Sequence, residues 1–124
     1  MDLKNKVCWF LGSSIIGLLI LRIYLWVFPF SNFNFGSYNI HHLYIGAFLL
    51  IIVLVLFLFN IVNNFSIILA GLSTSLVLDE IIYLIFTDGS DLAYLTGVSF
   101  FGMIISTISI FIFVLILYFI KREF

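Results

Sequence analysis

The chain has 124 residues, of which 65% are apolar and only 9% are charged, and its mean hydropathy is +1.34. Soluble domains carry about 25% charged residues, so this composition excludes a soluble globular domain and predicts an integral membrane protein. The formal net charge of −1, with five basic residues in all, offers no basic surface for nucleic acid.

Four apolar runs follow one another along the chain, at residues 7–28, 41–59, 65–86 and 97–120. Each run is close to the length of about 20 residues with which a helix crosses the hydrocarbon core of a bilayer. The alternation of polar and apolar residues that is typical of a membrane barrel does not occur. Residues 1–124 are therefore expected to form a single all-α transmembrane domain, an up-down bundle of four transmembrane helices with short loops.

The first run follows Lys4 and Lys6 and ends at Pro29. It resembles the start of a secretory signal, but it continues without a small-residue cleavage site, so we expect a retained span. Its one charged residue is Arg22, about six residues before its end.

The second run opens with His41 and His42. Imidazoles combined with carboxylates suit zinc, copper or ferrous iron, although adjacent histidines diverge around a helix and select no particular metal. His42 is expected to point inward because Gly46, one turn later, favours close helix packing, whereas His41 shares its face with Tyr44. A helix starting near Ser37 would bring both rings to the depth of the carboxylates in the third run. The competing interpretation is that both rings anchor the helix end at the interface.

The third run contains Asp79 and Glu80 side by side. A charge at bilayer depth costs about 2.5 to 3.5 kcal/mol on insertion scales, which indicates a functional role for the pair. Asp79 belongs to a small and polar stripe at i+4 spacing, formed by Gly71, Ser75, Asp79 and Tyr83. This stripe predicts that Asp79 faces the bundle interior. Glu80 lies about 100° around the helix and is expected to face a second groove or a subunit contact.

Arg22 and Asp79 are predicted to lie at matching depths, because both helices run outward and both residues lie six or seven positions before the helix end. An ion pair between them would offset part of the insertion cost, and the alternative is a bridge that only fixes helix register. Tyr83 lies one turn after Asp79, within reach of a hydrogen bond to that carboxylate or to a shared ligand. Its alternative role is that of a core tyrosine with a satisfied hydroxyl.

Small residues recur at intervals of three and four in the fourth run and predict a helix-packing seam. They are Ser99, Gly102, Ser106 and Ser109. Basic residues flank the outer ends of the first and last runs, at Lys4, Lys6, Lys121 and Arg122. Both termini are therefore expected to be cytoplasmic, and residues 87–96 and the histidines external.

These observations predict a small multi-pass membrane protein with an intramembrane polar site near its external face. The site would bind a metal ion or handle protons, for transport or for membrane-embedded chemistry. The predicted metal ligands for zinc, copper or iron are His41, His42, Asp79 and Glu80, and the further polar site residues are Arg22 and Tyr83. The alternative is a noncatalytic accessory subunit of a larger membrane complex. We also expect that the chain can form a homo-oligomer. Such an oligomer is not expected to form a pore, because the polar stripe on the third helix is too short to line one. The familiar catalytic and nucleotide-binding motifs do not occur, so no reaction is predicted.

Overall fold

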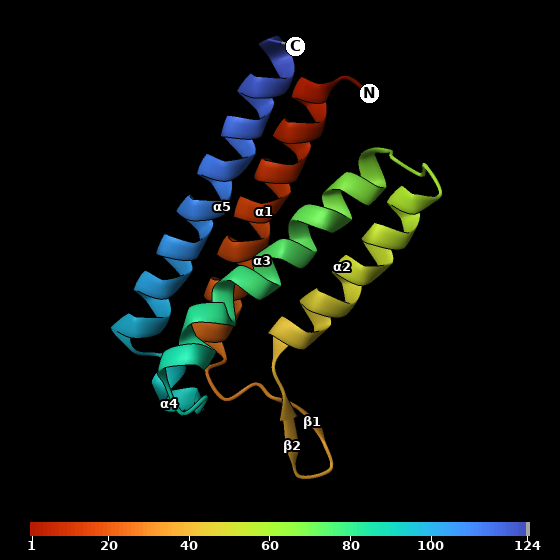
Figure 1. Ribbon diagram of the computed structural model, residues 1–124. Coiled ribbons are helices and arrows are strands. Elements are labelled where there is room, and N and C mark those ends of the chain that lie inside the picture. Colours follow the sequence, from red (N-terminus) through yellow and green to blue (C-terminus); the bar gives the residue numbers. More distant parts are fainter. Residues whose placement is uncertain (124) are drawn as a thin grey trace.

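The computed structural model describes residues 1–123 and is helical apart from one short β-hairpin (Figure 1). Four long helices form most of the molecule: α1 (Leu3–Val27), α2 (His42–Leu58), α3 (Asn64–Phe86) and α5 (Gly97–Glu123). The connections contain strands β1 (Phe33–Phe35) and β2 (Tyr38–Ile40) and the short helix α4 (Asp91–Tyr94). The long helices coincide with the four predicted apolar runs to within a few residues.

Three of these helices, α1, α3 and α5, are long and apolar enough to cross a membrane. They agree with the prediction of an integral membrane protein. The remaining long helix, α2, is also apolar but has only 17 residues.

The central helix of the fold is α3, which packs against α1, α2 and α5. Ten of its residues are buried, whereas α2 and α5 bury two each, so α3 forms most of the core. Figure 1 shows α1 and α5 running side by side, with α3 crossing them toward α2. The polar stripe was correctly predicted to face inward, since all four of its residues are buried.

Glycines allow the helices to approach α3 closely. A Cβ added to Gly46 of α2 would lie 2.7 Å from the Ser73 carbonyl oxygen, and one added to Gly102 of α5 would lie 2.5 Å from Ile82 Cγ2. Small residues at such crossings maximise van der Waals contact where lipid provides no hydrophobic driving force between helices. These contacts hold α2 and α5 against opposite parts of α3.

Serine hydroxyls add two hydrogen bonds to α3, one from α1 and one from α5. Ser14 of α1 donates to the Gly71 carbonyl at 3.1 Å, and Ser106 of α5 donates to the Leu78 carbonyl at 2.8 Å. Ser106 confirms the predicted seam on α5, but Ser109 is exposed and its hydroxyl donates to the Ile105 carbonyl of its own helix.

The two ends of the molecule differ. Both termini and the α2–α3 connection lie at one end, and the hairpin and α4 lie at the other (Figure 1). The loop after the first run contains a β-hairpin, which was not predicted from the sequence. Its strands pair Phe33 with Ile40, and Gly36 has a φ of 63° in the turn, which favours glycine. The alternation of apolar and polar residues in the two strands was the available signal.

Candidate functional site

Six side chains from four elements meet beside the start of α2. We call them the buried polar cluster: Arg22 of α1, His41 and His42 at the start of α2, Asp79 and Glu80 of α3, and Tyr94 of α4. The two carboxylate residues are the most buried members, since Asp79 is 0% and Glu80 3% exposed. The predicted polar residues therefore converge, and the Tyr83 ring packs against His41 and Tyr94 at the edge of the cluster.

Asp79 has three side-chain partners. Its Oδ1 accepts a hydrogen bond from Arg22 Nε at 2.5 Å, and its Oδ2 accepts one from the Tyr94 hydroxyl. His42 Nε2 lies 2.8 Å from the same Oδ2. Because a buried carboxylate has lost its water, these three partners replace hydration and stabilise its negative charge.

Arg22 connects three helices. In addition to Asp79, its Nη2 donates to the Ser99 carbonyl at 3.1 Å and to the Ser99 hydroxyl at 3.0 Å on α5. The guanidinium carbon lies 4.5 Å from the centre of the Tyr94 ring, which is a cation–π contact. The predicted Arg22–Asp79 pair is confirmed, and Ser99 is an additional partner that the sequence indicated only as a packing residue.

Glu80 binds the start of α2. Its Oε2 accepts a hydrogen bond from the Leu43 backbone N–H at 2.9 Å, and its Oε1 lies 3.1 Å from His41 Nδ1. A carboxylate at a helix N-terminus is stabilised by the helix dipole and by the free N–H groups. Of the two predicted environments for Glu80, the structure therefore has the second groove, filled by α2 of the same chain, and Glu80 is not available for a subunit contact.

His42 lies between the two carboxylates. Its Nε2 faces Asp79 at 2.8 Å and its Nδ1 faces Glu80 Oε1 at 3.4 Å. A neutral imidazole carries one N–H and can donate toward only one of them, whereas the imidazolium can donate toward both. With an imidazolium, the charges of Arg22 and His42 balance those of Asp79 and Glu80. With a neutral ring, the cluster keeps one uncompensated negative charge, which is costly when buried.

The histidines reach the carboxylates without an early start of α2. The helix begins at His42 with His41 as its N-cap residue, close to the predicted boundary at residue 41, so the earlier start near Ser37 does not occur. Because α3 continues past Glu80 to Phe86, about 9 Å of further helix at 1.5 Å per residue, α2 begins short of the end of α3 and beside the two carboxylates. The hairpin leads the chain back past this extension before α2 begins.

Tyr94, and not Tyr83, is the tyrosine that binds Asp79. The Tyr83 hydroxyl instead donates to the Ser90 carbonyl at 2.7 Å. Of the two roles predicted for Tyr83, the structure therefore has the core tyrosine with a satisfied hydroxyl. The loop after α3 folds back over the helix end, which supplies the Ser90 carbonyl and brings Tyr94 over Asp79. Burial, together with the charge of Asp79, raises the pKa of Tyr94 above the ordinary tyrosine value, which keeps its hydroxyl a neutral donor.

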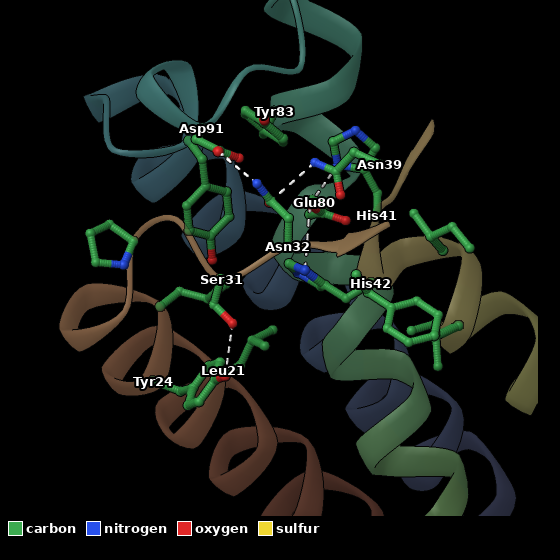
Figure 2. Close-up of a pocket in the computed structure, with 16 residues that line it drawn as sticks. Leu21, Tyr24, Ser31, Asn32, Asn39, His41, His42, Glu80, Tyr83 and Asp91 are labelled. Atoms are coloured by element: carbon green, nitrogen blue, oxygen red, sulfur yellow. Dashed lines mark hydrogen bonds and ion pairs between the residues drawn. The ribbon is translucent and has the colours of Figure 1, made fainter. Parts of the chain in front are cut away.

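A partly open cavity of about 320 Å³ adjoins the cluster on the hairpin side (Figure 2). His41, His42, Glu80 and Tyr94 contribute to its wall. Figure 2 also shows a chain of hydrogen bonds across the region above these side chains. Asn39 Nδ2 donates to Asn32 Oδ1 at 3.2 Å, and Asn32 Nδ2 donates to Asp91 Oδ2 at 2.9 Å. This chain joins the hairpin region to α4.

The four predicted metal ligands are close together, but they contact one another or other groups of the chain. Glu80 Oε1 lies near both histidine rings, and Asp79 is held by Arg22 and Tyr94. Among residues 1–123, no group of three or more His, Cys, Asp or Glu side chains has an arrangement that could hold a metal ion.

The fold and the site define an α-helical protein with three helices of membrane-spanning length and an arginine–carboxylate–histidine network beside a cavity. No protein-family model, curated protein or solved structure matches the chain.

Proposed function

We propose that the chain is a four-span membrane protein whose buried polar cluster takes up and releases a proton at the external face, for transport or membrane-embedded chemistry. The observation that carries the proposal is the position of His42, with one ring nitrogen facing Asp79 and the other facing Glu80. One proton on His42 makes the cluster neutral, and its loss leaves the cluster with a single negative charge. Histidine is the side chain best suited to such a change near neutral pH.

The proposed topology makes α2 the fourth span. Its 17 residues extend about 25 Å, near the lower limit for a transmembrane helix. Both termini lie at the same end, which favours an even number of crossings (Figure 1). That end also carries the basic residues Lys4, Lys6, Lys121 and Arg122, so the positive-inside rule favours cytoplasmic termini. The cluster and its cavity would then face the external side.

The contacts of the two histidines offer a route for a proton into the cluster. His41 Nδ1 faces Glu80, and its Nε2 faces the loop at Gly89. A proton taken up at Nε2 from the external side would release the Nδ1 proton toward Glu80, whose Oε1 also faces His42. An imidazole can act in this way because it has a separate site for a proton on each side of its ring. His41 would be the entry group and His42 the group that holds the proton.

Proton flux into liposomes tests this function. Purified wild-type protein in vesicles with an internal pH dye should carry protons down an imposed gradient, and Asp79→Asn should lower the rate by about tenfold or more, as expected for removing a proton-site carboxylate. Asp88→Asn is the matched control, because Asp88 is an exposed carboxylate outside the cluster. Wild-type flux equal to that of protein-free vesicles, or full activity of Asp79→Asn, would contradict the proposal.

A metal ion could take the place of the proton and supply the missing positive charge. Zinc, copper or iron would then be held by His41, His42, Asp79 and Glu80, whose ring nitrogens and carboxylate oxygens suit these ions. Occupancy requires these side chains to exchange some present contacts for the metal. Measuring the zinc, copper and iron content of purified wild type, Asp79→Asn and His42→Ala decides whether the site holds a metal ion or a proton. A stoichiometric metal that both variants lose would support the metal version, and its absence from wild type would remove it.

The accessory-subunit alternative loses the feature that favoured it, because Glu80 is bound by α2 of the same chain. The exposed apolar faces of the long helices agree equally well with contact to lipid. Native mass spectrometry in mild detergent tests this alternative and the expected homo-oligomer. A lone monomer would count against both, and a defined complex would support assembly.

A further inference from the structure

The cavity beside the cluster has the ionisable groups of a cation site. Its wall includes the carboxylates of Glu80 and Asp91 and the rings of His41 and His42, and it includes no lysine or arginine from the described part of the chain. Asp91 Oδ2 accepts a hydrogen bond from the neutral Asn32 amide, and no ion pair to Asp91 is formed within residues 1–123. The wall therefore favours positive ligands and disfavours anions.

The remaining lining favours an organic cation over a hydrated inorganic one. Four aromatic side chains line the cavity, from Tyr24, Phe33, Tyr83 and Tyr94. Aliphatic side chains also line it, among them Leu21, Leu25 and Ile45. Substituted ammonium ions bind such mixtures of aromatic rings and carboxylates, because their alkyl groups fill apolar space and their charge is attracted by the rings. The volume of about 320 Å³ is at the lower end of the range for small-molecule sites, which limits the ligand to a small one.

We propose that the cavity binds a small alkylammonium ion of about the size of choline. This inference rests on the proposed transport function and names the substrate class of the same site. The ammonium group would lie between the carboxylates of Glu80 and Asp91, and its alkyl groups would contact the aromatic and aliphatic lining.

Calorimetric titration of the purified full chain in nonionic detergent tests this binding, with choline chloride and its uncharged isostere 3,3-dimethyl-1-butanol as probes. Choline should bind at least about tenfold more tightly than the isostere, because only choline carries the charge.

Two carboxylate variants test whether choline binds in this cavity. Asp91→Asn removes a charge at the cavity wall outside the buried polar cluster and should weaken choline binding about threefold or more. Asp88→Asn, which removes a carboxylate that does not line the cavity, should leave binding unchanged. Equal binding of the isostere, or no choline binding by folded wild type that still carries protons, would overturn this inference and leave the proton function standing.

Discussion

Arg22 and Asp79 are 57 residues apart in the sequence, yet the Arg22 guanidinium donates directly to the Asp79 carboxylate in the interior of the helix assembly. The same guanidinium reaches Ser99 on α5, so one side chain connects α1, α3 and α5. The partner of the other carboxylate is the start of α2, where the Leu43 N–H donates to Glu80. The adjacent pair of acids on α3 thus binds α1 and α2 directly, and α5 is connected to Asp79 through Arg22.

Removing the charge of Asp79 should destabilise the protein. Asp79→Asn leaves Arg22 without its carboxylate, and breaking one side of a buried ion pair typically costs about 3 to 5 kcal/mol. Unfolding in mixed detergent micelles, followed by circular dichroism, measures the loss. In the double variant Arg22→Gln/Asp79→Asn the unpaired charge is also gone, so the combined loss should be smaller than the sum of the two single losses. Additive losses would contradict a direct pair.

Each ring nitrogen of His42 should be in contact with a different carboxylate of α3, Nε2 with Asp79 and Nδ1 with Glu80. Protein labelled with ¹⁵N only in histidine gives signals from His41 and His42 alone, since the chain has two histidines. His42→Gln assigns the two sets of signals. Glu80→Gln should shift the His42 Nδ1 signal, because that nitrogen faces Glu80. A His42 Nδ1 signal that is the same in wild type and Glu80→Gln would contradict this contact.

Tyr94 should stay protonated when exposed tyrosines ionise. Its pKa is raised in the folded protein, chiefly by burial, so the folded state keeps a proton that the unfolded chain loses above pH about 10. This contribution to stability is complete below that pH and declines as the pH rises further. Absorbance of tyrosinate near pH 11 should therefore be the same in wild type and Tyr94→Phe. A decrease in the variant would show that Tyr94 ionises with the others.

Loss of the hydroxyl in Tyr94→Phe should also weaken the site. The hydroxyl donates to a buried carboxylate, and hydrogen bonds to charged groups contribute about 1.5 to 3 kcal/mol. Unfolding measurements at neutral pH check this value. Tyr24→Phe is the matched control, because the Tyr24 hydroxyl contacts the Ser31 hydroxyl at an exposed position. Equal losses in the two variants would argue against a special role for Tyr94.

Close packing of α2 on α3 should be necessary for the cluster. In Gly46→Ala the new methyl group would lie 2.7 Å from both the Ser73 carbonyl oxygen and Leu76 Cβ, so α2 must move. Overpacking of this kind costs about 1 to 3 kcal/mol, and the shift of α2 should lower proton flux as well. Gly12→Ala is the control, because a Cβ there meets nothing within 4 Å. Similar behaviour of the two variants would contradict the close contact.

The sequence by itself determined the long helices and the charged side chains that need a partner in an apolar interior. The four apolar runs predicted the long helices, and the depth of Arg22 and Asp79 predicted their pair, because helix rise and the cost of a charge in an apolar medium are properties of the chain alone. The partners of Glu80, the contact between Tyr94 and Asp79, and the meeting of both histidines with the carboxylates were decided only by the tertiary structure. Each depends on how the hairpin and the loop containing α4 return the chain past the end of α3. No helical periodicity encodes those return paths, because they are set by the packing of α2 against α3 and of α4 against α5.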